Sequence, residues 1–164
     1  MSVALAATWN PRGELPRLQR LLPLLERVYA AIAITLPPGN DPVALASRVR
    51  PGACWVSENL EGSGAHSRVC GELRLTVNPD WSWGRYLAIQ SALCAPVDHI
   101  HYADMDRLLR WVETLPDEWR WAVDRLQSSD VLIFGRTPSA YATHPQALLQ
   151  TEAISNRVVS ALVG

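Results

Sequence analysis

Short apolar runs alternate with amphipathic stretches along this chain, and that alternation constrains its fold more than any other feature of the sequence. The first two runs are Val3–Thr8 and Ala31–Leu36, and each is followed by a proline-containing loop. Apolar runs of this length are typical of buried strands, and apolar residues spaced three or four apart are typical of helices packed on one face. The sequence therefore predicts an α/β fold, with a mostly parallel sheet and helices on both faces.

The alternation continues beyond these two runs. Helices are expected over residues 15–29, 42–50, 84–93, 106–115 and 143–162, and a further helix opens at residues 114–117 and carries Trp119, Ala122, Val123 and Leu126 on one side. Further strands are expected over residues 53–57, 97–103 and 131–135. Asp41, followed by proline, has the pattern of a helix N-cap, and Thr114 and Thr143 each begin a capping-box pattern. Residues 58–82 show little periodicity outside 72–77, so they are expected to form a long excursion of the kind that often carries function.

Composition favours one compact domain. With 164 residues, of which 48% are hydrophobic and 19% charged, the chain is long enough and apolar enough to bury a core. Its 15 cations are all arginine, so chemistry that needs a lysine, such as a Schiff base or a P-loop, is excluded. The formal net charge is -1 and the charges are interspersed, which argues against nucleic acid as a partner.

Cysteine usage and the N-terminal residues predict a cytoplasmic location. Cys54, Cys70 and Cys94 are widely spaced and odd in number, which favours reduced thiols over a disulfide framework. Residues 1–7 are mildly apolar but lack the basic start of a signal peptide. No apolar run approaches the roughly 20 residues of a membrane-spanning helix, so no integral membrane segment is expected.

Two carboxylates, Asp104 and Asp106, stand one residue apart where a predicted strand gives way to a helix. Ligands of parallel sheets sit at the carboxyl ends of the strands, and carboxylates there can hold a hard divalent cation together with phosphate oxygens. The alternative is that either aspartate is simply the N-cap of the helix that follows. The sequence leaves both interpretations open.

A longer pattern surrounds these two aspartates. Gly84-Arg85 opens an apolar helix, which is followed by a polar turn, a strand and then Asp104-x-Asp106. This order resembles the central motif of GT-A-type glycosyltransferases, and the resemblance covers roughly residues 2–136. It implies a Rossmann-like domain that binds a nucleotide-diphosphate sugar, with the Asp-x-Asp motif reaching the ribose and, through Mg²⁺ or Mn²⁺, the diphosphate. Asp104 and Asp106 are then the metal ligands.

The resemblance also assigns the nucleotide-sugar site. Its members are expected to be Thr8, Asn10 and Arg12 in the loop after the first strand, together with Arg85 and Asp104. Arg85 lies near a helix N-terminus, where a phosphate would also meet free backbone N–H groups. The chain departs from the family in length: residues 1–164 are expected to form a single domain in which only residues 136–164 remain for the acceptor side.

The catalytic group is the weakest part of the resemblance. Asp130, Glu152 and His144 are the candidates, and none stands in a recognisable context. A catalytically silent nucleotide-binding or assembly domain is therefore the alternative to an active transferase. A sugar-phosphate nucleotidyltransferase is disfavoured, because its glycine-rich, arginine-bearing sequence is absent after the first strand.

Three further features each have two interpretations. His99 and His101 share one face of a strand, and either bind zinc or, as we prefer, pack with satisfied hydrogen bonds. Trp81 and Trp83 either stack on a sugar or base, or cap the core. The terminal helix has apolar residues on more than one stripe, which predicts a homodimer unless residues 58–82 cover it. These apolar residues are Leu148, Leu149, Ile154, Val158, Val159, Leu162 and Val163.

Overall fold

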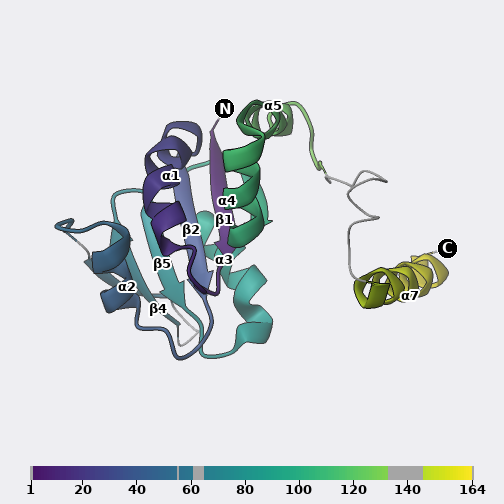
Figure 1. Cartoon of the computed structure of the whole chain (residues 1–164), viewed down its shortest axis with the longest axis horizontal. Helices are drawn as coiled ribbons and strands as arrows, with labels where there is room; N and C mark the ends of the chain where they lie inside the picture. Colours follow the sequence, from purple (N-terminus) through teal and green to yellow (C-terminus); the bar gives the residue numbers. More distant parts are fainter. Residues whose placement is uncertain (1, 55, 61–64, 133–145, 164) are drawn as a thin grey trace. The chain divides into compact units, whose positions relative to one another are not determined.

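The computed structural model describes residues 2–54, 56–60, 65–132 and 146–163, and the chain divides into two compact units, residues 1–130 and 131–164. The first unit is a six-stranded sheet with helices on both faces (Figure 1). The second unit contains one long helix, α7 (Gln146–Val163). No helix in the described part of the chain is both long enough and apolar enough to cross a membrane.

The sheet has the strand order β3-β4-β5-β2-β1-β6. Its parallel part consists of β1 (Val3–Thr8), β2 (Ala31–Leu36), β5 (Leu73–Val77) and β6 (His99–Asp104). Antiparallel β3 (Val56–Leu60) and β4 (Ala65–Cys70) extend it at the β5 edge. Numbered in chain order, the parallel strands read 3-2-1-4, so the direction of winding reverses between β1 and β6. In doubly wound sheets ligands bind at such a reversal, outside the carboxyl ends of the strands.

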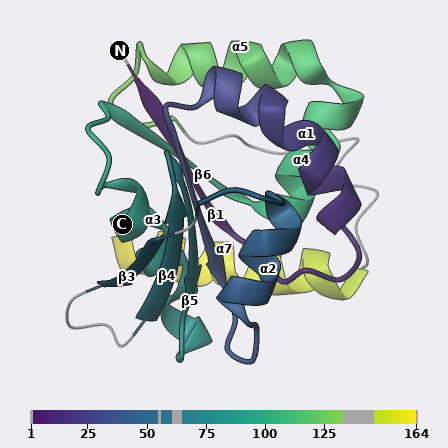
Figure 2. The same ribbon diagram turned by 90° about the vertical axis from the view of Figure 1, so that its left-hand side faces the viewer.

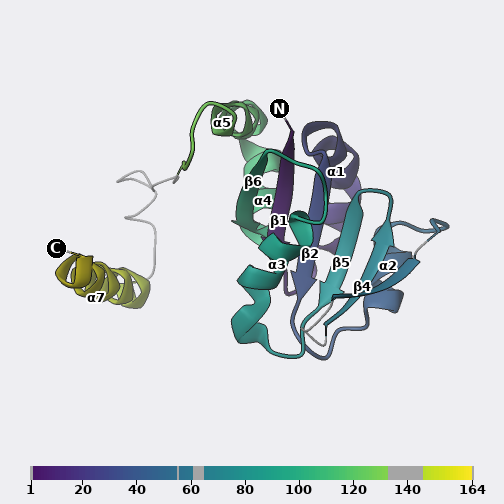
Figure 3. The same ribbon diagram turned by 180° about the vertical axis from the view of Figure 1, so that it is seen from behind.

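The helices divide between the two faces of the sheet. Helices α1 (Leu15–Val28), α2 (Pro42–Val49) and α4 (Met105–Thr114) cover one face, and α3 (Gly84–Ala92) covers the other (Figures 2 and 3). A short 3₁₀ turn, η1 (Trp81–Trp83), leads into α3. Helix α5 (Pro116–Leu126) lies beside the start of β1, at the edge opposite the carboxyl ends of the parallel strands (Figure 1).

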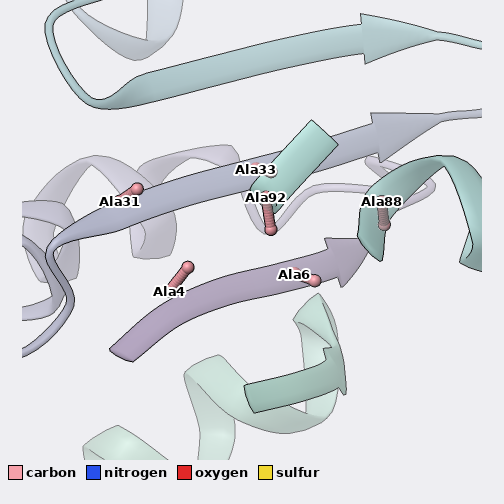
Figure 4. Close-up of a cluster of buried hydrophobic side chains, with 6 residues drawn as sticks. All are labelled: Ala4, Ala6, Ala31, Ala33, Ala88 and Ala92. Atoms are coloured by element: carbon pink, nitrogen blue, oxygen red, sulfur yellow. The ribbon is translucent and has the colours of Figure 1, made fainter. Parts of the chain in front are cut away.

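Small side chains set the contact between α3 and the sheet. Alanines from β1, β2 and α3 form a buried layer (Figure 4), and they are Ala4, Ala6, Ala31, Ala33, Ala88 and Ala92. The alternate residues Leu5, Ile32 and Ile34 are also buried, and they point to the opposite face because side chains alternate along a strand. Both faces of β1 and β2 are therefore apolar, which explains why these strands appear in the sequence as continuous apolar runs.

Several elements agree with the sequence prediction. The first two strands lie where they were expected, and Asp41 caps α2 by accepting a hydrogen bond from the backbone N–H of Val43 at 2.8 Å. The mostly parallel sheet and the helices on both faces are likewise confirmed.

Other expectations need correction. The long excursion expected over residues 58–82 contains regular structure in its described part, because β4 and β5 form an antiparallel hairpin that turns at Gly71, whose φ of 57° favours glycine. The capping box at Thr114 is wrong: its hydroxyl donates to the carbonyl of Arg110, and Leu115 occupies the N-cap of α5. The strand expected over residues 53–57 is shifted, since β3 begins at Val56.

The strand expected over residues 131–135 is only partly described. Val131 and Leu132 are not in a strand, and the rest of that range lies outside the described residues. Thr143, with its expected capping box, also lies outside them.

Candidate functional site

A pocket of about 240 Å³ opens at the carboxyl ends of β1 and β6, where the winding of the sheet reverses. Five of the residues expected to bind a nucleotide sugar or metal line this pocket together, although they come from two distant parts of the sequence. They are Thr8, Asn10, Arg12, Asp104 and Asp106. The full lining is Thr8, Trp9, Asn10, Arg12, Glu14, Trp81, Asp104 and Asp106.

Asp104 is held in place by hydroxyl groups of the two strands that form the pocket floor. Its Oδ1 accepts hydrogen bonds from Thr8 Oγ1 and from the Tyr102 hydroxyl, each at 3.2 Å. The backbone register places Thr8 directly beside Asp104 across the β1–β6 pairing. Oδ2 lies 3.7 Å from Nε of Arg107. One carboxylate oxygen is therefore fixed by the two strands, and the other is held only by the long ion pair with Arg107, which a bound cation would have to displace.

The capping interpretation fails for Asp104. The residue occupies the N-cap position of α4, but its side chain makes no capping hydrogen bond. Its oxygen is directed instead to the hydroxyls of Thr8 and Tyr102. Asp104 therefore serves the pocket and not the end of the helix.

Asp106 is exposed in the first turn of α4, and no described residue forms a hydrogen bond or an ion pair with it. Among the residues that the structure describes, no group of three His, Cys, Asp or Glu side chains could hold a metal. Mg²⁺ is nevertheless commonly bound by one or two carboxylates, with water and phosphate oxygens completing its coordination. Oδ2 of Asp104, which accepts no hydrogen bond from the described residues and is paired with Arg107 at 3.7 Å, and the carboxylate of Asp106 are the two groups that could act in that mode of binding.

The loop after β1 supplies the opposite wall of the pocket. Trp9 is buried, with its backbone N–H bonded to the carbonyl of Thr35 at 2.9 Å, while Asn10 and Arg12 are exposed. Glu14 accepts a hydrogen bond from the backbone N–H of Arg12 at 2.8 Å, and this bond is the main reason that its pKa is lowered. The nearby indole N–H of Trp9 also lowers the pKa of Glu14, although Trp9 Nε1 forms no hydrogen bond with any described residue.

Arg85 does not line the pocket. It is exposed at the second position of α3, and its positive charge acts on the hydroxyl of Tyr102. Burial raises the pKa of Tyr102, and the charge of Arg85 opposes that rise. Arg85 therefore lies near the Tyr102–Asp104 pair, but outside the pocket itself.

Of the three catalytic candidates, the structure places only Asp130 relative to the pocket, and Asp130 does not line it. Asp130 is exposed and follows α5, which lies at the opposite edge of the sheet (Figure 1). Glu152 belongs to α7 in the second unit, and its side chain lies outside the description. His144 lies outside the described residues altogether.

The packing interpretation of the two histidines is confirmed for His101, which lies in the core, but not for His99. Trp119 Nε1 donates to the Tyr29 hydroxyl at 2.9 Å, so the Tyr29 proton is directed to Nδ1 of His101, 2.6 Å away. Burial raises the pKa of Tyr29 and lowers the pKa of His101 to about 4. His99, two residues earlier, is half-buried, and its Nδ1 has no hydrogen-bond partner among the described residues.

Sequence reasoning missed two residues of the site, Glu14 and Tyr102. Tyr102 was detectable, because it lies two residues before Asp104 and strand side chains at that spacing share a face. Glu14 carried no such signal, since its role depends on the path of the loop after β1. Trp81, for which stacking and core capping were both open, lines the pocket and is 40% exposed.

Comparison with known proteins finds no match to this chain among family models, curated proteins or solved structures. The pocket and the residues that line it are therefore the features that bear on the function of the chain.

Proposed function

We propose that this chain binds a nucleotide-diphosphate sugar through a divalent cation, and that it acts in glycosyl transfer as a GT-A-type transferase or transferase-like domain. One observation carries the proposal. Asp104, Asp106 and the Thr8–Arg12 loop, which are separated by more than 90 residues of sequence, line one pocket at the reversal point of the sheet.

Four of the lining residues have a direct role in this proposal. Oδ2 of Asp104 and the carboxylate of Asp106 hold Mg²⁺ or Mn²⁺, which neutralises the charge that develops on a diphosphate leaving group. Asn10 and Arg12 donate hydrogen bonds to the nucleoside or its phosphates, and Arg85 adds positive charge nearby. The volume of about 240 Å³ is below the roughly 300–1,000 Å³ of sites that enclose a drug-sized ligand, so part of the ligand would lie outside the pocket mouth.

The second candidate is a catalytically silent nucleotide-binding or assembly domain of the same fold. It is favoured by the placement of Asp130, which is outside the pocket. Glu14 is the remaining carboxylate in the pocket, and its lowered pKa makes it a weak base at neutral pH. Hydrolysis of a nucleotide sugar by the purified chain would favour the transferase, and binding without hydrolysis would favour the silent domain.

A thermal-shift panel tests the proposal. UDP, GDP, CDP, ADP and dTDP are each added with and without Mn²⁺, and Mn²⁺ alone is the control. A nucleotide at 100 times its Kd adds about 2.7 kcal/mol, which raises the melting temperature of a chain of this size by roughly 5–10 °C. We expect one nucleotide to stabilise the protein only when the metal is present. Stabilisation by none of them, or equal stabilisation without metal, would refute the proposal.

A homodimer and a cytoplasmic location also remain proposals. Ile154 and Val158 lie four residues apart on α7 and are exposed, which supports a second copy of the chain as their cover. Residues 58–60 and 65–82 belong to the strands β3, β4 and β5, to η1 and to the segments that connect them, all of which are part of the first unit. The three cysteines are free thiols, in keeping with a reducing compartment. Sedimentation of a single 18.2 kDa species at micromolar concentration would exclude the dimer.

A further inference from the structure

Three exposed aromatic side chains follow one another in η1 and the first turn of α3, and the first of them, Trp81, lines the pocket. Trp81, Trp83 and Tyr86, which we call the aromatic ledge, are 40%, 57% and 51% exposed. They come from η1 and the first turn of α3, and the rings of Trp83 and Tyr86 meet edge to face with their centroids 5.6 Å apart. Large aromatic rings are costly to leave in water, so a cluster of them on the surface indicates a ligand or partner.

Trp81 joins the ledge to the pocket, because it belongs to both. Its ring is packed against Gly84, the first residue of α3: a Cβ at that position would lie only 2.9 Å from Trp81 Cε3. Gly84 has a φ of −55°, so its backbone does not require glycine. The glycine leaves room for the indole in this position, and a larger residue at position 84 would require the ring to shift.

We propose that the aromatic ledge binds a carbohydrate, and that this carbohydrate is the acceptor for the sugar bound in the pocket. The second half of this statement rests on the proposed function. The flat faces of Trp and Tyr rings stack on the apolar C–H faces of pyranose rings, while neighbouring polar groups bond to the sugar hydroxyls. An acceptor must approach the donor sugar, and the ledge begins at the pocket where that donor would sit.

The groups around the ledge fit a neutral polar ligand better than a membrane or a helix of another protein. Asp80 and Arg85 flank it with opposite charges, and Ser82 and Gln90 are exposed beside them. Hydrogen bonds from the hydroxyl and backbone N–H of Ser82 lower the pKa of Asp80, so that carboxylate is ionised at neutral pH. A membrane-binding surface would combine its aromatic residues with several basic residues, whereas one basic residue, Arg85, flanks the ledge.

The test is calorimetric binding of maltohexaose, cellohexaose and chitohexaose to the full chain. We expect at least one hexasaccharide to bind, and Trp83→Ala to weaken its binding about tenfold. Tyr86→Ala should act in the same direction. Trp121→Ala is the matched control, because Trp121 is 63% exposed on α5, away from the ledge, and its loss should leave binding unchanged. Nucleotide binding with Mn²⁺ is measured on the same variants, and Trp83→Ala should retain it.

Each of the remaining outcomes would overturn either the carbohydrate site or the proposed function. Absence of hexasaccharide binding, equal losses in Trp83→Ala and Trp121→Ala, or Trp83-dependent binding to phosphatidylserine vesicles without sugar binding would overturn the carbohydrate site. Sugar binding that depends on Trp83 in a protein that binds no nucleotide would keep the site and refute the proposed function. Melting temperatures of all variants identify any loss that comes from unfolding.

Discussion

Thr8 Oγ1 donates a hydrogen bond to Asp104 Oδ1 over 3.2 Å, and the two residues are 96 positions apart in the chain. Backbone pairing of β1 with β6 sets the two Cα atoms side by side, so the bond is a direct consequence of the sheet register. The Tyr102 hydroxyl donates to the same oxygen. Asp104 is thus oriented before any ligand binds, which reduces the free energy needed to order the site on binding.

Thr8→Val tests this orientation, because valine keeps the shape of threonine and removes the hydroxyl. We expect a loss of about 1 kcal/mol in stability, together with weaker nucleotide binding in the presence of Mn²⁺. Thr35→Val is the matched control. Thr35 is paired with Thr8 in the neighbouring strand, and its buried hydroxyl has no hydrogen-bond partner among the described residues. Denaturant unfolding should find Thr35→Val neutral or stabilising; equal losses in both variants would contradict the role of the Thr8 hydroxyl.

Gly84→Ala tests the packing of Trp81. An alanine favours a helix, but its Cβ would displace the indole from its position against residue 84. In the parent background we expect a changed Trp fluorescence spectrum and weaker nucleotide binding. In a Trp81→Ala background the same substitution should stabilise the protein by up to about 1 kcal/mol. Effects on stability that simply add in the double variant would show that the ring and the glycine are independent.

His101 gives the protein a specific dependence on pH. Burial lowers its pKa to about 4, against roughly 6.5 in the unfolded chain, so the unfolded state binds more protons between these values. The contribution is fully present above about pH 6.5 and is lost as the pH falls toward 4, for a total of about 3 kcal/mol.

His101→Gln should remove this part of the pH dependence. Glutamine does not titrate, and its side-chain oxygen can still accept the hydrogen bond from Tyr29. Melting temperatures between pH 7.5 and 4.5 would follow a flatter curve in this variant than in the parent. A parent and a His101→Gln variant with parallel curves would mean that His101 does not carry the effect.

Strands that are buried on both faces could be predicted from the sequence, whereas strands with a mixed pattern could not. Val3–Thr8 and Ala31–Leu36 were predicted because every residue in them is buried or nearly so. Strand β4 alternates polar with small or apolar residues in a hairpin, and its pattern was too weak to separate from a loop. The Asp-x-Asp pair and the loop after β1 were predicted as a site from motif and strand order. The partners of Asp104 depend on a register between distant strands, which local pattern does not encode.

The most direct test of the central claim compares Asp106→Asn with Asp117→Asn. Both aspartates are exposed at the second residue of a helix, α4 and α5 respectively, so each loss removes a similar favourable interaction with a helix dipole, about 0.3–1 kcal/mol. Only Asp106 lines the pocket.

Calorimetric titration with the nucleoside diphosphate that stabilises the parent, in the presence of Mn²⁺, separates the two roles. We predict that Asp106→Asn abolishes metal-dependent binding, that Asp117→Asn leaves it unchanged, and that both variants lose the same small amount of melting temperature. Binding by Asp106→Asn as tight as that of the parent would contradict a metal-dependent nucleotide site at this pocket.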